Sequence, residues 1–398
     1  MSKKILILGA SRYYSKSIEA ARLAGYYVIA VDRNEQSEGF SAADAFAVCD
    51  IIDREGILKV AQSYGIDGIV PVNDYGVPTA AFVASKLGLP GISEQSALWA
   101  TSKIEMRKRW SETGVPCPQF RIATTVEEIK NAVEQVGLPC ILKPGNGIGG
   151  ASRGVVVVRN MSELERAISF SQQFYNDKTT LVETFVDAEY EHSAEVIIHS
   201  GVPHVIAISD KIKTPLPYRV DKNVLYPTAL SGERLKELKH QICRAVLALD
   251  IHVGAAHVEA ATTKEGCILF ELGARCGGGG TPEPIVHFST GINEFVETVR
   301  VLVGDPPENL VPSRDFGCNY HFITPPPGRV KTIEGLEAAK SLVGVLDAEL
   351  FMKPGDEIPF VTVGGQRAGF IITGAPSREE AYAVGCKAEA LIEFAYEN

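Results

Sequence analysis

The most informative stretch of this chain reads Gly254-Ala-Ala-His-Val-Glu-Ala260, then Ala-Thr-Thr-Lys-Glu-Gly266, then Cys267-Ile-Leu-Phe-Glu-Leu-Gly-Ala-Arg275. Two short apolar runs joined by a polar turn predict an antiparallel β-hairpin. Each run contains a glutamate, Glu259 and Glu271, and a carboxylate inside an apolar strand is costly unless a cation compensates it. We therefore expect both glutamates to share a polar site with Arg275.

The glutamate pair favours a hard metal ion. Paired carboxylates without histidine or cysteine at ligand spacing are typical of magnesium rather than zinc, with manganese as a further hard cation that such a site accepts. The competing interpretation is a sheet face that points into solvent. We favour a metal site because Arg275 and a run of glycines at 277–280 follow the pair directly.

A glycine-rich segment, Pro144-Gly-Asn-Gly-Ile-Gly-Gly-Ala-Ser-Arg153, lies between predicted strands at 140–143 and 154–158. Such a loop exposes backbone N–H groups that can bind a polyphosphate, and Lys143 and Arg153 add positive charge. The alternative is an ordinary flexible hairpin. The segment is not a Walker loop, because no Gly-Lys-Ser/Thr ends it and a strand follows it. That following strand also makes the G-x-S-x-G match at 150–154 a chance match, since a nucleophile elbow needs a helix there.

A third candidate segment, Leu181-Val-Glu-Thr-Phe-Val186, is a predicted strand edge, and Glu191 follows it. A strand edge that leaves a lid can pair its backbone with the edge of adenine, while a nearby carboxylate binds the ribose hydroxyls. The segment comes after the phosphate loop and before the paired glutamates, and this order supports a nucleotide site.

With Lys103, Lys143, the glycine loop, Glu183, Glu191, Glu259, Glu271 and Arg275 in this order, the whole chain resembles the ATP-grasp superfamily. Ser102-Lys103-Ile-Glu-Met-Arg107 is similar to the first nucleotide-lysine segment of that family, and Ile141-Leu-Lys143-Pro is similar to the second. The closing Glu271-Leu-Gly-Ala-Arg275-Cys-Gly-Gly resembles the L-amino acid ligase and biotin carboxylase-like branch. The resemblance implies an α/β fold with a lid and a catalytic sheet in the middle of the chain and a small α+β domain at its end.

The resemblance also implies roles for individual residues. The implied ATP-binding residues are Lys103, Lys143, Gly147, Gly149, Gly150, Ser152, Glu183, Phe185, Val186 and Glu191. Glu259 and Glu271 would hold magnesium, and Lys143 and Arg275 would act in catalysis. Three positions depart from the family pattern: Gly273 stands where many members have a metal-binding Asn, Ser102 stands where Asp is common, and Glu189 is an alternative to Glu191 as the ribose ligand. The number of metal ions is therefore open.

The chain begins with a strand, helix, strand pattern, in which apolar residues 5–8 end at Gly9 and apolar residues 27–31 end at Asp32. This pattern predicts a parallel doubly wound sheet. It is also how a dinucleotide domain begins, but the turn lacks G-x-G-x-x-G, so NAD binding is disfavoured. We expect four domains, at 1–95, 96–190, 191–305 and 306–398, with a helical segment at 96–113.

The composition of the chain limits its possible binding partners, the state of its cysteines and its compartment. The 398 residues include 39 Lys and Arg against 49 Asp and Glu, a net charge of −10, and no block of like charge, which argues against nucleic-acid and anionic-membrane partners. The eight cysteines contain no C-x-x-C and are expected to be reduced core thiols. No signal peptide or membrane span is evident, so the expected compartment is the cytoplasm. A homodimer is one open alternative for the assembly.

These observations predict an ATP-dependent ligase that joins a small carboxylate, such as an amino acid, to an amine through an acyl phosphate. The alternatives are a carboxylase that uses bicarbonate and a nucleotide-binding module without turnover. Loops at the carboxyl ends of strands would bind the substrates. The candidate substrate residues are Asp74, Tyr75, His257, Gly278 and Gly279. We expect Asp74 to pair with a substrate ammonium and Arg275 with the activated carboxylate.

Overall fold

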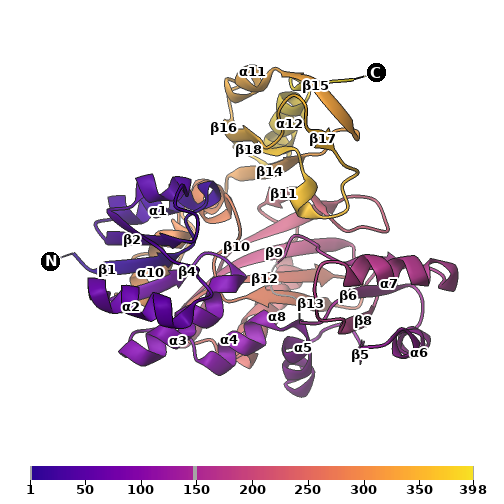
Figure 1. The fold of residues 1–398 in the computed structure, drawn as a ribbon, viewed down its shortest axis with the longest axis horizontal. Helices are drawn as coiled ribbons and strands as arrows, with labels where there is room; N and C mark the ends of the chain where they lie inside the picture. Colours follow the sequence, from indigo (N-terminus) through magenta and orange to yellow (C-terminus); the bar gives the residue numbers. More distant parts are fainter. Residues whose placement is uncertain (1, 147–149, 398) are drawn as a thin grey trace.

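The computed structural model describes residues 2–146 and 150–397, and the described part contains four β-sheets (Figure 1). The N-terminal sheet consists of β1 (Lys4–Leu8), β2 (Tyr27–Asp32), β3 (Ala45–Val48) and β4 (Gly68–Pro71). Its strands pair in parallel in the order β3-β2-β1-β4. The parallel sheet predicted from the sequence is confirmed.

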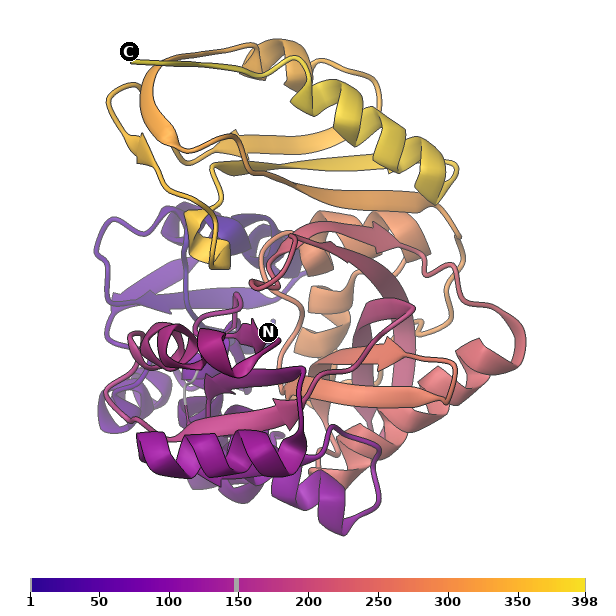
Figure 2. The ribbon, with the colours of Figure 1, turned by 90° about the vertical axis from the view of Figure 1, so that its right-hand side faces the viewer.

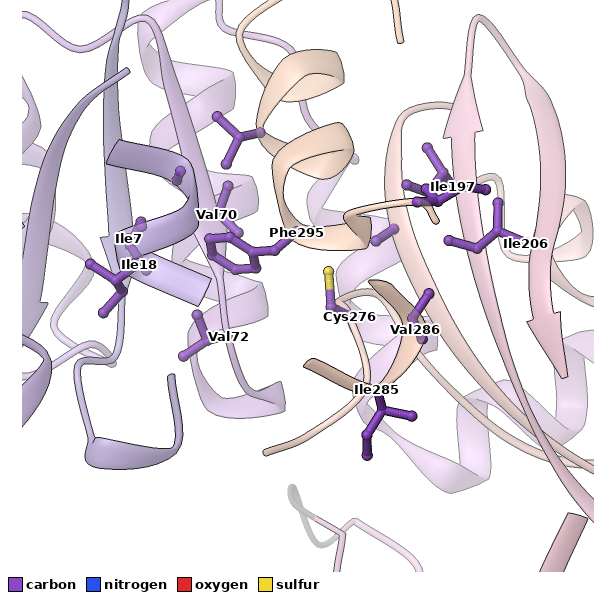
Figure 3. Close-up of a cluster of buried hydrophobic side chains, with 14 of the residues drawn as sticks. Ile7, Ile18, Val70, Val72, Ile197, Ile206, Cys276, Ile285, Val286 and Phe295 are labelled. Atoms are coloured by element: carbon purple, nitrogen blue, oxygen red, sulfur yellow. The ribbon is translucent and has the colours of Figure 1, made fainter. Parts of the chain in front are cut away.

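Helices cover both faces of the N-terminal sheet. The elements between its strands and after them are η1 (Arg12–Tyr14), α1 (Ser15–Leu23), η2 (Glu38–Ala42), α2 (Arg54–Tyr64), η3 (Asp74–Gly76) and α3 (Val77–Leu87). One face packs against α2 and α3, and the other packs against α1 and α10 (Glu294–Leu302). Figure 3 shows Phe295 of α10 between Val70 of the N-terminal sheet and Cys276. A helix from late in the chain therefore completes the first sheet.

The turn after β1 serves packing. Asp32 accepts a hydrogen bond from the backbone N–H of Ala10 at 3.0 Å, and Arg12 forms an ion pair of 2.6 Å with Glu349. In the disfavoured NAD interpretation, the Asp32 carboxylate would bind a ribose. In this structure it holds the turn itself.

A small antiparallel sheet follows, in the order β5-β8-β6-β7. Its elements are β5 (Phe120–Ala123), α6 (Val126–Val136), β6 (Cys140–Pro144), β7 (Val156–Val158), η4 (Met161–Glu163), α7 (Leu164–Gln172) and β8 (Thr180–Thr184). Cys140, Leu142 and Val182 face a core shared with α6 and α7. Because side chains alternate between the faces of a strand, Lys143 and Glu183 point to the opposite face, where the candidate site lies. We call this unit the lid sheet.

The largest sheet has the order β13-β12-β9-β10-β11-β14-β18-β16. Its strands are β9 (Tyr190–His199), β10 (Val202–Lys213), β11 (Asp221–Tyr226), β12 (Gly254–Thr262), β13 (Cys267–Gly273), β14 (Gly317–Ile323), β16 (Val345–Leu350) and β18 (Gly369–Ala375). The predicted hairpin is confirmed as the antiparallel pair β12 and β13. Because β11 pairs with β14, this sheet continues across residue 305, where we expected a domain boundary. The division into four domains stays a prediction.

The remaining elements include the fourth sheet, in the order β17-β15-β19, which belongs to the C-terminal part that Figure 2 shows at the top of the molecule. They are α8 (Gly232–Ala248), η5 (Thr281–Val286), α9 (His287–Thr290), β15 (Gly328–Glu334), α11 (Leu336–Lys340), β17 (Glu357–Ile358), η6 (Gly364–Gln366), α12 (Arg378–Glu389) and β19 (Glu393–Tyr396). None of the described helices has the length and apolar character needed to cross a membrane.

The eight cysteines carry no disulfide, and four of them are buried. The expectation that all of them lie in the core is wrong for Cys386, which is exposed. The reason is the geometry of α12, which buries only Ala381, Gly385 and Ala388 on one face and leaves Cys386 on the other.

The predicted helical segment at 96–113 is two helices, α4 (Glu94–Thr101) and α5 (Lys103–Glu112). Ser102 between them has an extended backbone, and its Oγ accepts a hydrogen bond from the N–H of Glu105 at 3.3 Å. This bond caps the start of α5 and explains the break. It also places Lys103 in the first turn of α5, from which its side chain reaches the candidate site.

Candidate active site

One cavity of about 540 Å³ is lined by residues of the N-terminal loops, the lid sheet, the large sheet and the C-terminal part. The predicted site residues that line it are Asp74, Lys103, Lys143, Gly150, Ser152, Glu183, Phe185, Val186, Glu191, His257, Glu259, Glu271, Arg275, Gly278 and Gly279. Tyr75 is outside this lining, and Gly147 and Gly149 lie outside the described residues. The structure thus brings residues from distant parts of the chain to one place.

The paired glutamates lie side by side in the lining of the cavity. Glu259 and Glu271 are direct cross-strand partners in the hairpin, so both side chains point to the same face. Glu271 forms an ion pair of 2.6 Å with Lys103, and Glu259 forms one with Lys211. Burial raises the pKa of Glu259, but the cations of Lys211 and Lys213 outweigh it and hold this pKa at about 2. Burial lowers the pKa of Lys103, and the Glu271 carboxylate raises it above its ordinary value.

Three buried charged residues, Arg107, Lys143 and Glu183, form a charge triad on the side of the lid sheet that faces the cavity. The Glu183 carboxylate lies 2.6 Å from the Lys143 Nζ and 2.6 Å from the Arg107 Nε. Burial lowers the pKa of Lys143 to about 8, although Glu183 opposes this shift. The sequence-based assignment concerned only the backbone of Glu183, whereas its side chain positions Lys143. Sequence reasoning did not assign Arg107 a role, although it lies in the Lys103 segment.

Two backbone N–H groups of the segment expected to contact adenine already donate hydrogen bonds within the protein. The N–H of Phe185 donates to the carbonyl of Pro139 at 3.3 Å, and the N–H of Thr184 donates to Gln119 at 3.0 Å. The backbone of Phe185 can therefore offer a ligand only its carbonyl. Val186, which follows it, also lines the cavity.

The two alternatives for the ribose carboxylate differ in position. Glu191 lines the cavity and pairs with Lys213 at 3.3 Å and with Arg219. Glu189 is not in the described lining and pairs with Arg234. The geometry favours Glu191. The lysines of β10 were missed in the sequence, although the alternation Lys211-Ile-Lys213 signals that both point to one face of a strand.

Asp74 and Arg275 bind each other. The Nε and Nη2 atoms of Arg275 donate to the two Asp74 oxygens at 3.0 and 3.1 Å. We expected these residues to bind substrate groups of opposite charge, and the structure shows them as one bidentate pair. A Cβ atom on Gly273 would lie 2.7 Å from the Asp74 Oδ1. The departure of Gly273 from the family pattern therefore has a physical reason, since the Asp74 carboxylate occupies the space of a side chain there.

His257 is oriented by a buried carboxylate that the sequence analysis did not assign a role. The His257 Nδ1 lies 2.9 Å from the Glu195 Oε1, and Glu195 is fully buried. The Tyr226 hydroxyl and the Gly277 N–H, both at 3.1 Å, also donate to Glu195. The sequence signal that could have indicated Glu195 is its place between Ala194 and the apolar run at 196–198, since a carboxylate inside an apolar strand needs a partner.

The described end of the glycine loop is held by three other parts of the chain. The Ala151 carbonyl accepts a hydrogen bond from the N–H of Gly364 at 2.8 Å. The Ser152 hydroxyl donates to the Arg219 carbonyl at 2.9 Å, and the Arg153 guanidinium donates to the Tyr75 hydroxyl at 3.2 Å. Residues 150–153 line the cavity, and Tyr75, which is outside the lining, contacts this loop through Arg153.

Comparisons with known proteins agree with this geometry. Residues 18–91 match the model of the ATP-grasp N-terminal domain, 136–283 the ATP-grasp domain, and 321–397 the L-amino acid ligase C-terminal domain 2. The chain is 24% identical to the L-arginine-specific L-amino acid ligase of Bacillus subtilis over 330 residues. This alignment covers 80% of the present chain and 78% of the Bacillus subtilis ligase.

Two solved structures have the same fold. The L-amino acid ligase from Bacillus licheniformis has a TM-score of 0.85 at 25% identity and covers 100% of this chain and 99% of its own. The biotin carboxylase domain of the Hydrogenobacter thermophilus 2-oxoglutarate carboxylase, in complex with MgADP, has a TM-score of 0.75 at 18% identity, over 99% of this chain and 91% of its own. The second shows the fold alone.

The three domain matches, together with the lysines and paired glutamates in one cavity, show that the chain belongs to the ATP-grasp superfamily. The resemblance stated from the sequence is confirmed. Within the superfamily, the protein is a carboxylate-amine ligase, an enzyme that forms a C–N bond with release of ADP.

Proposed function

We propose that this ligase joins the carboxylate of one amino acid to the amino group of a second, with ATP and magnesium. The observation that carries the proposal is the charge arrangement at Glu259 and Glu271: two carboxylates share one sheet face, and Lys103 and Lys211 bind them in the cavity that also holds Arg275. The C-terminal match to an L-amino acid ligase domain supports amino acids as the substrate class.

The nucleotide would lie between the lid sheet and the large sheet. Lys103, Lys143 and the backbone of the glycine loop would bind its phosphates, and Glu191 would bind the ribose. Adenine would contact the backbone of residues 183–186. Phosphoryl transfer depends on charge neutralisation and positioning, which buried lysines provide.

The donor set of the hairpin fits magnesium. Glu259 and Glu271 offer hard carboxylate oxygens, and Gly273 adds no ligand of its own. Each carboxylate now binds a lysine, so metal and lysine would compete for the same oxygens. Magnesium, when bound with ATP, would supply positive charge at the terminal phosphates. Manganese, which takes the same ligands, is the expected substitute.

The proposed chemistry has two steps. The substrate carboxylate attacks the γ-phosphorus, the bond to ADP breaks, and an acyl phosphate forms. The neutral amine of the second amino acid then attacks the acyl carbon, the C–O bond to phosphate breaks, and the amine proton leaves with the phosphate as hydrogen phosphate. Arg275 would stabilise the acyl phosphate, and the glycine loop would exclude water that otherwise hydrolyses it.

A phosphate-release screen over pairs of amino acids, with bicarbonate as a separate arm, tests the proposal. We expect release that depends on two amino acids and not on bicarbonate. Lys143→Met should reduce the rate a hundredfold or more, because it deletes a charge that faces the transferred phosphoryl group. Lys236→Met is the control, since Lys236 is exposed and its one ion pair among the described residues is with Glu233. Release driven by bicarbonate alone would contradict the proposal and favour a carboxylase.

A further inference from the structure

The cavity has a second region that the nucleotide does not explain. Five aromatic residues of its lining, Tyr13, Tyr14, Tyr320, Phe322 and Phe351, form what we call the aromatic wall. The Tyr320 and Phe322 ring centroids are 4.3 Å apart, and those of Tyr13 and Phe351 are 5.7 Å apart. The wall joins the turn after β1 to the C-terminal strands. It adds a group of aromatic rings to a lining that also contains the charged pairs described above.

Arg367 adjoins this wall. Its guanidinium carbon lies 3.6 Å from the centroid of the Phe322 ring, and its Nη2 donates to the Asp221 carbonyl at 2.8 Å. Its Nε is buried without a hydrogen-bond partner, and no carboxylate of the described residues lies within 4.0 Å of the group. Burial lowers the pKa of Arg367, and the Asp221 carboxylate, which pairs with Lys211 and Lys213, opposes this shift only in part.

The other cations of the cavity differ from Arg367, because nearly all have a carboxylate partner. The pairs are Lys103 with Glu271, Lys143 with Glu183, Lys211 with Glu259, Lys213 with Glu191, Arg219 with Glu191, and Arg275 with Asp74. Arg153 is the other exception, and it lies on the glycine loop, where the proposed phosphates are. Arg367 is thus the cation left for an anion at the wall.

We propose that Arg367 and the aromatic wall bind the amine-donating amino acid, with its free carboxylate on Arg367 and an aromatic or large apolar side chain on the wall. This inference rests on the proposed function. The chemistry of ligation explains the need for such a cation. The first amino acid loses its carboxylate charge when it is phosphorylated, whereas the second keeps its carboxylate throughout and needs a fixed positive charge.

The wall lies next to the place where the acyl phosphate would form. A Cβ atom on Gly279 would lie 2.7 Å from the Tyr320 Oη, so the backbone four residues after Arg275 touches the wall. Only glycine fits at this contact, since the φ angle of Gly279 is also positive, at 64°. An amino acid on the wall would therefore have its amine close to the activated carboxylate of the first amino acid, which we place beside Arg275.

Charge argues for a neutral side chain on this substrate. The Arg12 guanidinium lies 4.6 Å from the Phe351 ring centroid, and Arg367 lies over Phe322. Arg12 pairs with Glu349 at 2.6 Å, so the positive charge at the wall that lacks a carboxylate partner among the described residues is that of Arg367. A lysine or arginine side chain would meet like charge there, whereas a phenylalanine or leucine side chain would bury apolar surface.

The test compares phenylalanine with phenylalaninamide, which lacks the carboxylate, as amine donors in the phosphate-release assay. The wild type should have a KM for phenylalanine about ten- to a hundredfold below that for the amide, as expected for a hydrogen-bonded ion pair. Arg367→Gln should remove this difference by raising only the KM for phenylalanine, and should leave the KM for ATP unchanged. Arg367→Lys should restore part of it. Arg329→Gln, an exposed arginine of β15, is the matched control.

The outcomes separate the two levels of the proposal. If Arg367→Gln raises both KM values equally, or neither, the assignment of Arg367 is wrong while the ligase function stands. If the wild type releases phosphate with no pair of amino acids, the proposed function fails and this inference fails with it. Phe351→Ala adds an independent check, because it should raise the KM for phenylalanine at least fivefold more than the KM for glycine. An equal rise would overturn the role of the wall.

Discussion

Replacing Glu183 by glutamine removes the negative charge that pairs with two buried cations, Arg107 and Lys143. Glu183 is 2% exposed, Arg107 is 0% exposed and Lys143 is 7% exposed, and both contacts to the carboxylate are 2.6 Å long. Removing one partner of a buried ion pair costs about 3–5 kcal/mol. The amide oxygen of Gln keeps one hydrogen bond, so we expect a loss near 3 kcal/mol in the free energy of unfolding.

Urea unfolding, followed by the fluorescence of the two tryptophans, Trp99 and the buried Trp110, measures this loss. Trp110 lies beside Arg107, with 5.4 Å between the guanidinium carbon and the ring centroid, and so reports on this region. Glu233→Gln is the control, because Glu233 is 87% exposed and exposed ion pairs contribute less than about 1 kcal/mol. A Glu183→Gln variant as stable as this control would refute the charge triad as a stabilising element.

The same substitution changes the pH dependence of ATP binding. Burial lowers the pKa of Lys143 to about 8 in the native protein, and the Glu183 carboxylate works against that shift. Only the protonated lysine attracts phosphate, so ATP affinity should fall as pH rises through about 8. Without the carboxylate, the pKa of Lys143 falls further, and in Glu183→Gln the decline should begin at lower pH. ATP titrations between pH 6 and 9 that give identical profiles for both proteins would contradict this.

Three further substitutions test the substrate side. Asp74→Asn leaves Arg275 without its carboxylate and should raise the KM for the amino acid about tenfold while the KM for ATP stays nearly constant; equal changes in both would remove Asp74 from the substrate site. Gly273→Ala places a Cβ 2.7 Å from an Asp74 oxygen and should lower kcat/KM at least tenfold, so an unchanged kcat/KM would contradict the role given to this close contact. Tyr75→Phe removes a hydrogen-bond acceptor of the glycine loop and should raise the KM for ATP a few-fold with little change in Tm.

Local patterns of the sequence predicted the parts of the site that depend on strand geometry. Glu259 and Glu271 are separated by a short turn, so the period-2 alternation of a hairpin suffices to place them side by side. The same alternation turns Lys143 toward the cavity and Leu142 away from it.

Pairs that depend on the docking of distant segments were not predictable in this way. Asp74 and Arg275 are 201 positions apart, and nothing in either local sequence specifies that they meet. The assignment of each to a substrate group failed to foresee their pairing for this reason. Arg367 was missed because a lone arginine near the end of a chain has no distinguishing pattern, although the alternating Tyr320 and Phe322 indicate an aromatic strand face.

The position of α10 has a consequence for how this protein can be made and divided. Residues 294–302 cover a face of a sheet whose strands end by residue 71, and a Cβ on Gly68 would lie 2.5 Å from the Leu302 carbonyl. During synthesis α1 is therefore the only one of the two helices that can cover this face, until more than 200 further residues have left the ribosome and α10 can dock. A fragment that ends near residue 95 lacks α10, leaves part of the apolar face around Ile7 and Val70 exposed to water, and should aggregate. A fragment that ends near residue 305 keeps α10 but loses β14, the partner of β11 in the large sheet.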